Sequence, residues 1–438
     1  MNKLYIAIVA MSILLCGCQK EDSPIFSKSA DERINEKLSE YQKLLVSAKY
    51  GWKTAYFPKD LKTGGWSYIF KFKEDGSVTM MGDFNKTTAT TEQPSKYRVC
   101  QIHKPSLIFD TYSMLHILAD PEQSNPPGPS LQGDFEFEFL AYKNDTLSLV
   151  GIHDKTILKM VMATDKDISL EKNVARRAQA KAFFSDLPTR PYFKGVSIGS
   201  SSIDISYVDK SKKVIIRYSK NNTVYTLTRA VAFNEQGMVL SSPVTLPNVS
   251  KPVSTIAFSG DSPTELSLLW NNEGTPCMVQ HMDYPVVPYI KELNTITQLE
   301  YFNIMRVSPS LKDALDQAET IPNLKDLQLM FDAFVKEGAP RESALLAYCP
   351  EATKKNWFQY NLQWTYGDDG VLKGKYVGAV SGLEHESKVK PLINQLCNGD
   401  GYTVADISIQ SFDKSSLVTA TLISRANSQD RIFIYTFL

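Results

Sequence analysis

One pentapeptide of the sequence carries the pattern of a hydrolase nucleophile. Residues Gly195-Val196-Ser197-Ile198-Gly199 match G-x-S-x-G, in which a strand delivers the serine to a sharp turn and a helix begins directly behind it. Here the following residues, 200–208, alternate as a strand does. We therefore interpret the glycines as a turn into an edge strand, and we predict no catalytic residue.

The histidines give no metal signature. The five of them include neither an H-E-x-x-H motif nor a pair spaced by four on a helix. The densest cluster is Glu384-His385-Glu386, but on a strand its two carboxylates would share one face while the imidazole points to the other. We predict a surface turn here and no metal.

Three aspartates near one loop offer oxygen atoms that Ca²⁺ could use. Asp110, Asp120 and Asp134 lack the regular alternation of a calcium-binding loop, and we interpret them as solvated turn carboxylates. His116, in the same region, is interpreted as a packing residue. No phosphate-binding glycine loop or dinucleotide fingerprint is present, so we predict no cofactor.

Aromatic residues are abundant, with 5 Trp, 21 Tyr and 21 Phe. Exposed Trp and Tyr rings form platforms on which ligands stack. Trp52 and Trp66 are the candidate binding residues, because each stands next to a glycine at the boundary of a predicted element. Trp357 and Trp364 form a second group. Core packing is the alternative for all four, since aromatic residues are ordinary core material in β-rich domains.

The N-terminus resembles that of a bacterial lipoprotein. Lys3 precedes an uncharged stretch, residues 4–15, which is too short to span a membrane but fits the apolar core of a secretory signal. The following Leu15-Cys16-Gly17-Cys18 resembles a lipobox, although Cys16 is not the usual small residue. The resemblance implies a signal peptide over 1–17, lipidation of Cys18 and a tether over 18–28. A conventional helix and a cleaved, unlipidated signal are the alternatives.

The overall composition excludes some classes of protein. The 48 basic and 48 acidic side chains give no net charge, so we expect no nucleic-acid partner. A chain of 438 residues is too long for one core, and we expect two or three domains. The cysteines Cys100, Cys277, Cys349 and Cys397 allow three full pairings, among which the sequence cannot choose. We expect unpaired buried thiols instead, because a chain this long does not need disulfides for stability.

The pattern of the chain predicts an α+β fold of mostly antiparallel β-sheets with a few packed helices. Ser29 and Glu32 have the spacing of a capping box before an amphipathic helix. Further helices are predicted at 170–187, 311–318 and 327–334, and strands elsewhere. We expect an N-terminal α+β domain at 29–188, a β-rich domain at 189–288, and a helical pair with an antiparallel β region at 289–438.

A family resemblance is carried by residues 30–34, 51–52, 72–78, 107–112, 116, 120–121, 133–137 and 229–240. Together these stretches resemble an uncharacterised family of Bacteroides-type outer-membrane lipoproteins, a domain of unknown function associated with SusC/SusD-like nutrient-uptake loci. The resemblance implies a surface-exposed accessory protein and carries no catalytic residues to transfer. An acidic cluster, Gln19-Lys20-Glu21-Asp22, resembles the surface-export signal of such lipoproteins and implies that the protein faces the cell exterior.

These observations lead to one expected function. We expect a protein anchored to the outer membrane by its N-terminal lipid, which captures a glycan or peptide for a SusC/SusD-like importer. A secreted or surface hydrolase with an unrecognised active site is the alternative. A purely structural partner of a larger outer-membrane complex is a third hypothesis.

Overall fold

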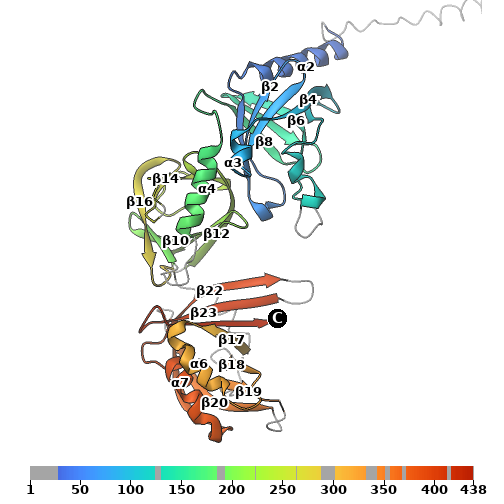
Figure 1. The fold of residues 1–438 in the computed structure, drawn as a ribbon. Helices are drawn as coiled ribbons and strands as arrows, with labels where there is room; N and C mark the ends of the chain where they lie inside the picture. Colours follow the sequence, from blue (N-terminus) through green and yellow to red (C-terminus); the bar gives the residue numbers. More distant parts are fainter. Residues whose placement is uncertain are drawn as a thin grey trace, which may run out of the picture.

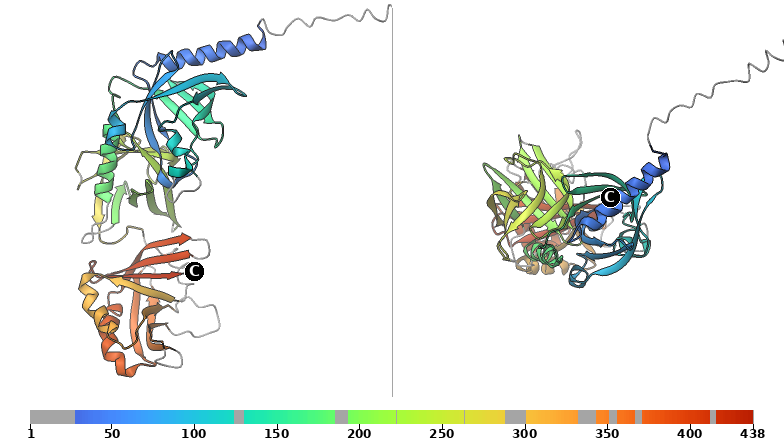
Figure 2. Two further views of the ribbon diagram at one scale, coloured as in Figure 1. Left: turned by 45° about the vertical axis from the view of Figure 1, so that its right-hand side comes forward. Right: turned by 90° about the horizontal axis from the view of Figure 1, so that it is seen from above.

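In the computed structural model, the described part of the chain forms three closed antiparallel barrels of eight strands each. The barrels follow one another along the sequence, and Figures 1 and 2 show them arranged in a row. The structure describes residues 28–123, 130–184, 193–221, 223–262, 264–287, 301–331, 343–350, 356–366, 371–411 and 416–437.

The first barrel follows a capped helix, α2 (Ala30–Ser47). The predicted capping box is confirmed, because Ser29 accepts a hydrogen bond from the backbone of Glu32 and the Glu32 side chain accepts one from the backbone of Ser29. The interior is filled by aromatic and aliphatic side chains, as expected for a barrel of eight strands. The strands are β1 (Trp52–Tyr56), β2 (Trp66–Phe72), β3 (Ser77–Gly82), β4 (Gln93–Gln101), β5 (Pro105–Phe109), β6 (Glu136–Lys143), β7 (Thr146–Gly151) and β8 (Ile157–Met162), with the short α3 (Lys86–Thr90) between β3 and β4.

A helix, α4 (Glu171–Phe184), leads from the first barrel to the second. It lies within the predicted helix at 170–187, whose last residues fall outside the described ones. Ala180, Phe183 and Phe184 of α4 belong to the core of the second barrel. The strands are β9 (Phe193–Ile198), β10 (Ser201–Val208), β11 (Lys213–Lys220), β12 (Thr223–Phe233), β13 (Gly237–Val244), β14 (Val253–Ser259), β15 (Ser267–Trp270) and β16 (Glu273–Met282).

The third barrel packs the helices α6 (Lys312–Glu319) and α7 (Glu386–Leu396) against its core. The helix predicted at 311–318 is therefore confirmed, but the one at 327–334 is wrong. Residues 326–330 form a strand in which Leu327 and Leu329 alternate with more exposed residues, so the period is two. The strands are β17 (Tyr301–Val307), β18 (Asp326–Met330), β19 (Ser343–Tyr348), β20 (Trp357–Tyr366), β21 (Val371–Ala379), β22 (Tyr402–Ser411), β23 (Ser416–Ser424) and β24 (Arg431–Phe437).

The predicted α+β class is wrong, because the protein is built of β-barrels with few helices. In each barrel the first strand pairs with the last, as β1 does with β8, β9 with β16 and β17 with β24. An open sheet and a closed barrel show the same alternation along each strand, so the local pattern could not distinguish them. Only the pairing of the first strand with the last, far apart in the sequence, distinguishes a closed barrel from an open sheet.

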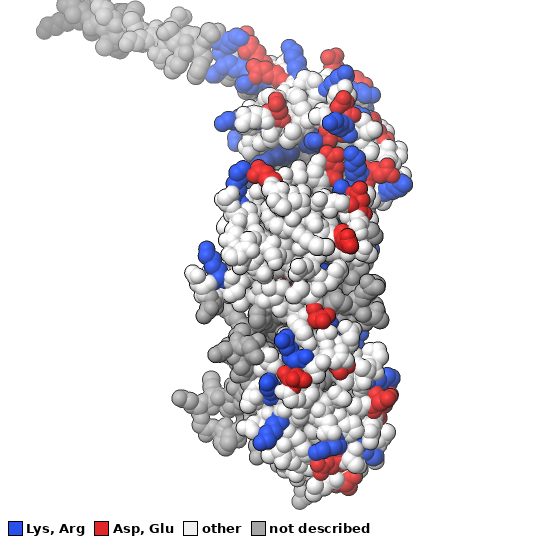
Figure 3. All heavy atoms as spheres, turned by 90° about the vertical axis from the view of Figure 1, so that its left-hand side faces the viewer, with Lys and Arg blue, Asp and Glu red and all other residues white. Residues whose placement is uncertain are grey.

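The second and third barrels also touch. The hydroxyl of Tyr284 donates a hydrogen bond of 2.8 Å to the backbone carbonyl of Ser424, and the guanidinium of Arg425 lies 4.2 Å from the centre of the Tyr284 ring. On the face drawn in Figure 3, basic and acidic side chains are interspersed rather than gathered by sign. No helix in the described ranges has both the length and the apolar character needed to cross a membrane.

Candidate binding cleft between the first two barrels

The first and second barrels are joined through buried polar groups. The backbone carbonyl of Phe233, at the end of β12, accepts a hydrogen bond of 2.6 Å from the hydroxyl of Ser67 and one of 2.8 Å from the side-chain amide of Asn173. The backbone N–H of Gly65 donates to the carbonyl of Val231 at 3.0 Å. All of these donors come from β2, the residues before it, or α4, so the N-terminal part of the chain holds the end of β12 in place.

A buried lysine of the second barrel reaches into this junction. The Lys212 ammonium lies 3.1 Å from the centre of the Trp66 ring and donates a hydrogen bond to the carbonyl of Gly65. The other face of Trp66 stacks on Phe84 at 4.3 Å between ring centres. Both faces of the Trp66 ring are therefore occupied by contacts within the protein.

Asp83, which is also buried and accepts a 2.8 Å hydrogen bond from the backbone of Ser67, interacts electrostatically with Lys212. Burial raises the pKa of Asp83 above its ordinary value, and the positive charge of Lys212 offsets part of this increase. Burial also lowers the pKa of Lys212, while the charge of Asp83 opposes that shift. Each charge is costly to bury and depends on the other, so the pair favours a fixed arrangement of the two barrels.

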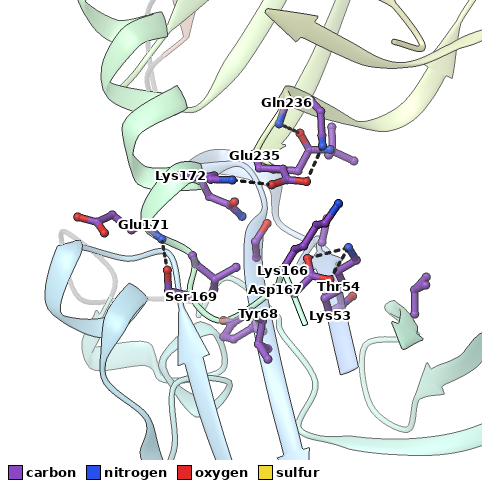
Figure 4. Close-up of a pocket in the computed structure, with 18 of the residues that line it drawn as sticks. Lys53, Thr54, Tyr68, Lys166, Asp167, Ser169, Glu171, Lys172, Glu235 and Gln236 are labelled. Atoms are coloured by element: carbon purple, nitrogen blue, oxygen red, sulfur yellow. Dashed lines mark hydrogen bonds and ion pairs between the residues drawn. The ribbon is translucent and has the colours of Figure 1, made fainter. Parts of the chain in front are cut away.

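Beside this junction lies a cleft of about 490 Å³. One wall is formed by β1, β2 and β8 of the first barrel, another by the segment leading into α4, and a third by the turn between β12 and β13. Figure 4 shows these elements converging on the cleft. The lining residues are Lys53, Thr54, Ala55, Ser67, Tyr68, Ile69, Lys159, Val161, Lys166, Asp167, Ile168, Ser169, Leu170, Glu171, Lys172, Asn173, Asn234, Glu235, Gln236 and Val239.

All three carboxylates of the lining form ion pairs. Asp167 pairs with Lys53 at 2.8 Å and Glu235 with Lys172 at 3.3 Å, and Figure 4 shows both pairs. Glu171 lies 3.3 Å from Lys86, outside the cleft. Burial acts to raise the pKa of Asp167, but hydrogen bonds from Lys53 and Thr164 outweigh it and lower the pKa, so this carboxylate is ionised at neutral pH.

Two lysines of the lining remain without an acidic partner. Lys159 and Lys166 are exposed and form no ion pair with any described residue. Lys159 lies on β8 beside Val161, whose side chain is 39% exposed, and Lys166 lies close in sequence to Ile168, which is 72% exposed. The cleft therefore presents uncompensated positive charge next to open aliphatic surface. Its described lining contains no histidine and no cysteine and therefore offers no nucleophile with a neighbouring imidazole base.

The tryptophans selected from the sequence lie elsewhere. Trp52 is 0% exposed and donates a hydrogen bond of 2.8 Å to the carbonyl of Leu45, while Trp66 contributes to the junction. Trp364 is buried in the core of the third barrel, and Trp357 lies 4.6 Å from Tyr348 between ring centres. Trp52 and Trp364 thus pack in barrel cores, the alternative given above, whereas Trp66 packs between two barrels. A ligand-binding role for Trp52 and Trp66 stays a prediction.

The G-x-S-x-G pentapeptide forms a β-hairpin. Ser197 pairs with Ser202 across β9 and β10, and Gly199 lies in the turn with a positive φ of 60°. No helix follows the serine, so the predicted turn into a strand is confirmed. The strand is not at an edge, however, because the barrel is closed.

The three aspartates considered as possible Ca²⁺ ligands do not form a cluster among the described residues. Asp110 pairs with Arg98, Asp120 accepts a hydrogen bond from Tyr112, and the described residues include no group of three potential metal ligands. Asp134 is 1% exposed, so its interpretation as a solvated carboxylate is wrong. It accepts hydrogen bonds from the backbone of His153, Asp154 and Thr156 and from the Thr156 hydroxyl, and so holds a loop.

The other residues singled out from the sequence lie in different parts of the fold. Glu384-His385-Glu386 lies where a 3₁₀ turn passes into α7, and His116 stacks on Phe135 at 4.1 Å. Lipidation at Cys18 falls outside the described residues and stays a prediction. The four cysteines among the described residues are free thiols: Cys100, Cys277, Cys349 and Cys397.

The cleft itself was not predicted from the sequence. Its lysines and carboxylates are of the types found on any exposed strand or loop, and they come from segments more than 180 residues apart. The one available signal is β8, where Ile157, Lys159 and Val161 face outward in alternation. That pattern indicates unusually apolar outer surface on this strand, but it does not reveal what lies opposite.

A family model described as a domain of unknown function, DUF4302, matches residues 22–253, which is more than half of the chain. The chain therefore belongs to this family, and the match includes every segment that lines the cleft. No curated protein matches the chain. Among solved structures, it is similar to a crystal structure of the DNA polymerase III subunit beta from Pseudomonas aeruginosa, with 7% identity, coverage of 93% of this chain and 98% of that chain, and a TM-score of 0.14. A similarity this low carries no argument about fold or function.

Proposed function

We propose that this protein is a lipid-anchored accessory protein on the outer face of the outer membrane, and that it captures a glycan or peptide for a SusC/SusD-like importer. The ligand binds in the cleft between the first two barrels. The acyl groups on Cys18 hold the processed N-terminus, and α2 leads from this anchor to the first barrel.

The observation that carries this proposal is the cleft of about 490 Å³ with exposed, unpaired Lys159 and Lys166. Concave sites with a few convergent polar groups are the usual form of a ligand-binding site. Binding without reaction is favoured because the carboxylates of the lining are already held in ion pairs. The lipobox and the acidic cluster after Cys18 support the location.

The test uses the full chain, extracted from membranes in detergent with its N-terminal modification intact. Calorimetry against panels of oligosaccharides and peptides should detect binding of at least one ligand without its hydrolysis. Hydrolysis of one ligand, with binding to none, would instead support the hydrolase alternative. Mass spectrometry of the same sample should find diacylated or triacylated Cys18, and an unprocessed N-terminus would remove the basis for the proposed location.

A further inference from the structure

The charged side chains of the cleft favour a ligand with negative charge. Four lysines and three carboxylates line it, and each carboxylate is neutralised by an ion pair. The unpaired groups, Lys159 and Lys166, are both positive. A ligand that brings negative charge gains attraction from both lysines, whereas a cationic ligand meets only carboxylates that are already paired.

The apolar part of the lining selects the kind of anion. The exposed hydrophobic side chains beside the two lysines are aliphatic, Val161 and Ile168. Among the described lining residues the aromatic one is Tyr68, which is 0% exposed, so these residues present no ring on which a sugar could stack. Aliphatic surface next to positive charge instead complements a peptide in which Asp or Glu stands near Leu, Ile or Val.

We propose that the cleft binds acidic peptides, with carboxylates of the peptide at Lys159 and Lys166 and an aliphatic side chain of the peptide on Ile168 and Val161. This inference rests on the proposed capture function and narrows its ligand to one class. The ion pairs Lys53–Asp167 and Lys172–Glu235 stay in place during binding and keep the walls of the cleft fixed.

The experiment uses the full chain and a pooled library of hexapeptides, blocked at both ends so that only side chains carry charge. Mass spectrometry of the bound fraction should find Asp and Glu enriched next to Leu, Ile or Val. The variant Lys159→Gln/Lys166→Gln should reduce binding of an enriched peptide by at least about fivefold, since each partly exposed ion pair contributes up to about 1 kcal/mol. The matched control, Lys96→Gln/Lys143→Gln, removes two exposed lysines that do not line the cleft and should leave binding unchanged.

A second pair of variants tests the apolar contact. Ile168→Ser should weaken binding of a Leu-containing peptide by about threefold to tenfold and leave its Ala version unaffected, because the burial of aliphatic surface is lost. Ile102→Ser, which changes an exposed isoleucine outside the cleft, should have no effect. Since Ile168 is 72% exposed, its replacement tests the contact without removing a core residue.

Oligogalacturonate, an acidic glycan, separates this inference from the proposed function. If it binds in a manner that depends on Lys159 and Lys166 while no peptide is enriched, the peptide assignment is overturned and the capture function stands. If neither the library nor the glycan panel binds, both proposals fail. Enrichment of acidic peptides that persists in the Lys159→Gln/Lys166→Gln variant overturns the assignment to this cleft.

Discussion

The Phe233 carbonyl is one of several contacts that join the first two barrels, and its two donors allow a quantitative prediction. The Phe233 carbonyl accepts hydrogen bonds from Ser67 and Asn173, and it lies beyond the β11–β12 ladder, whose register ends at Ala230. Removing one donor by Ser67→Ala or Asn173→Ala leaves the other in place, so each single change should cost about 1 kcal/mol, the net value of one hydrogen bond. Removing both leaves a buried carbonyl without either donor.

The double variant should therefore cost more than the sum of the singles. An unsatisfied buried carbonyl adds about 1–3 kcal/mol, so we expect a total of about 3–5 kcal/mol and a coupling of about 1–3 kcal/mol between the two sites. Both residues also line the cleft, so ligand affinity should fall in the double variant.

Hydrogen exchange at the Gly65 amide measures this opening directly, because its N–H crosses the junction to the carbonyl of Val231. Exchange should speed up about fivefold in each single variant and by about a hundredfold or more in the double variant. Ser106→Ala, which removes another buried hydroxyl of the first barrel, should leave Gly65 unchanged. A double variant whose effect equals the product of the two singles would refute the reasoning.

Three further predictions concern stability. Burial raises the pKa of Asp204 from 3.8 to about 6, so folding favours its protonated form. The contribution of Asp204 to the free energy of unfolding is therefore fully present below pH 3.8 and is lost, by about 3 kcal/mol, as the pH rises through 6. Asp204→Asn should flatten this decline, measured as melting temperatures from about pH 4 to about pH 7. Asp134→Asn keeps one acceptor oxygen but turns an amide donor towards Thr156, and should cost about 2–4 kcal/mol in denaturant unfolding of the first barrel. Trp66→Phe weakens the contact with the Lys212 ammonium and should lower junction stability by about 1 kcal/mol, measured as faster exchange at Gly65.

Local features of the fold were predictable where a short segment determines them. The capping box of Ser29 and Glu32 lies within four residues and was found from spacing alone. The strand at 326–330 was mistaken for a helix because Leu327, Phe331 and Phe334 have helical spacing. Leu329, which shares the buried face with Leu327, gives the period of two that the structure follows. Pairing with β17 and β19 decides between the two patterns, and it depends on residues far away in the sequence.

The candidate cleft was not predictable from the glycines beside Trp66, because the sequence pattern does not reveal their packing role. The sequence makes Trp66 a candidate binding residue because glycines precede it at an element boundary. The glycines have a different cause: a Cβ on Gly64, whose φ is +73°, would lie 2.5 Å from the Cβ of Lys212 and 2.8 Å from the carbonyl of Val231. Gly64 is thus required where one barrel approaches the backbone of the next. The same close approach places the β12–β13 turn opposite β1 and β8. Trp66 and its glycines therefore lie at the contact between the two barrels that forms the cleft.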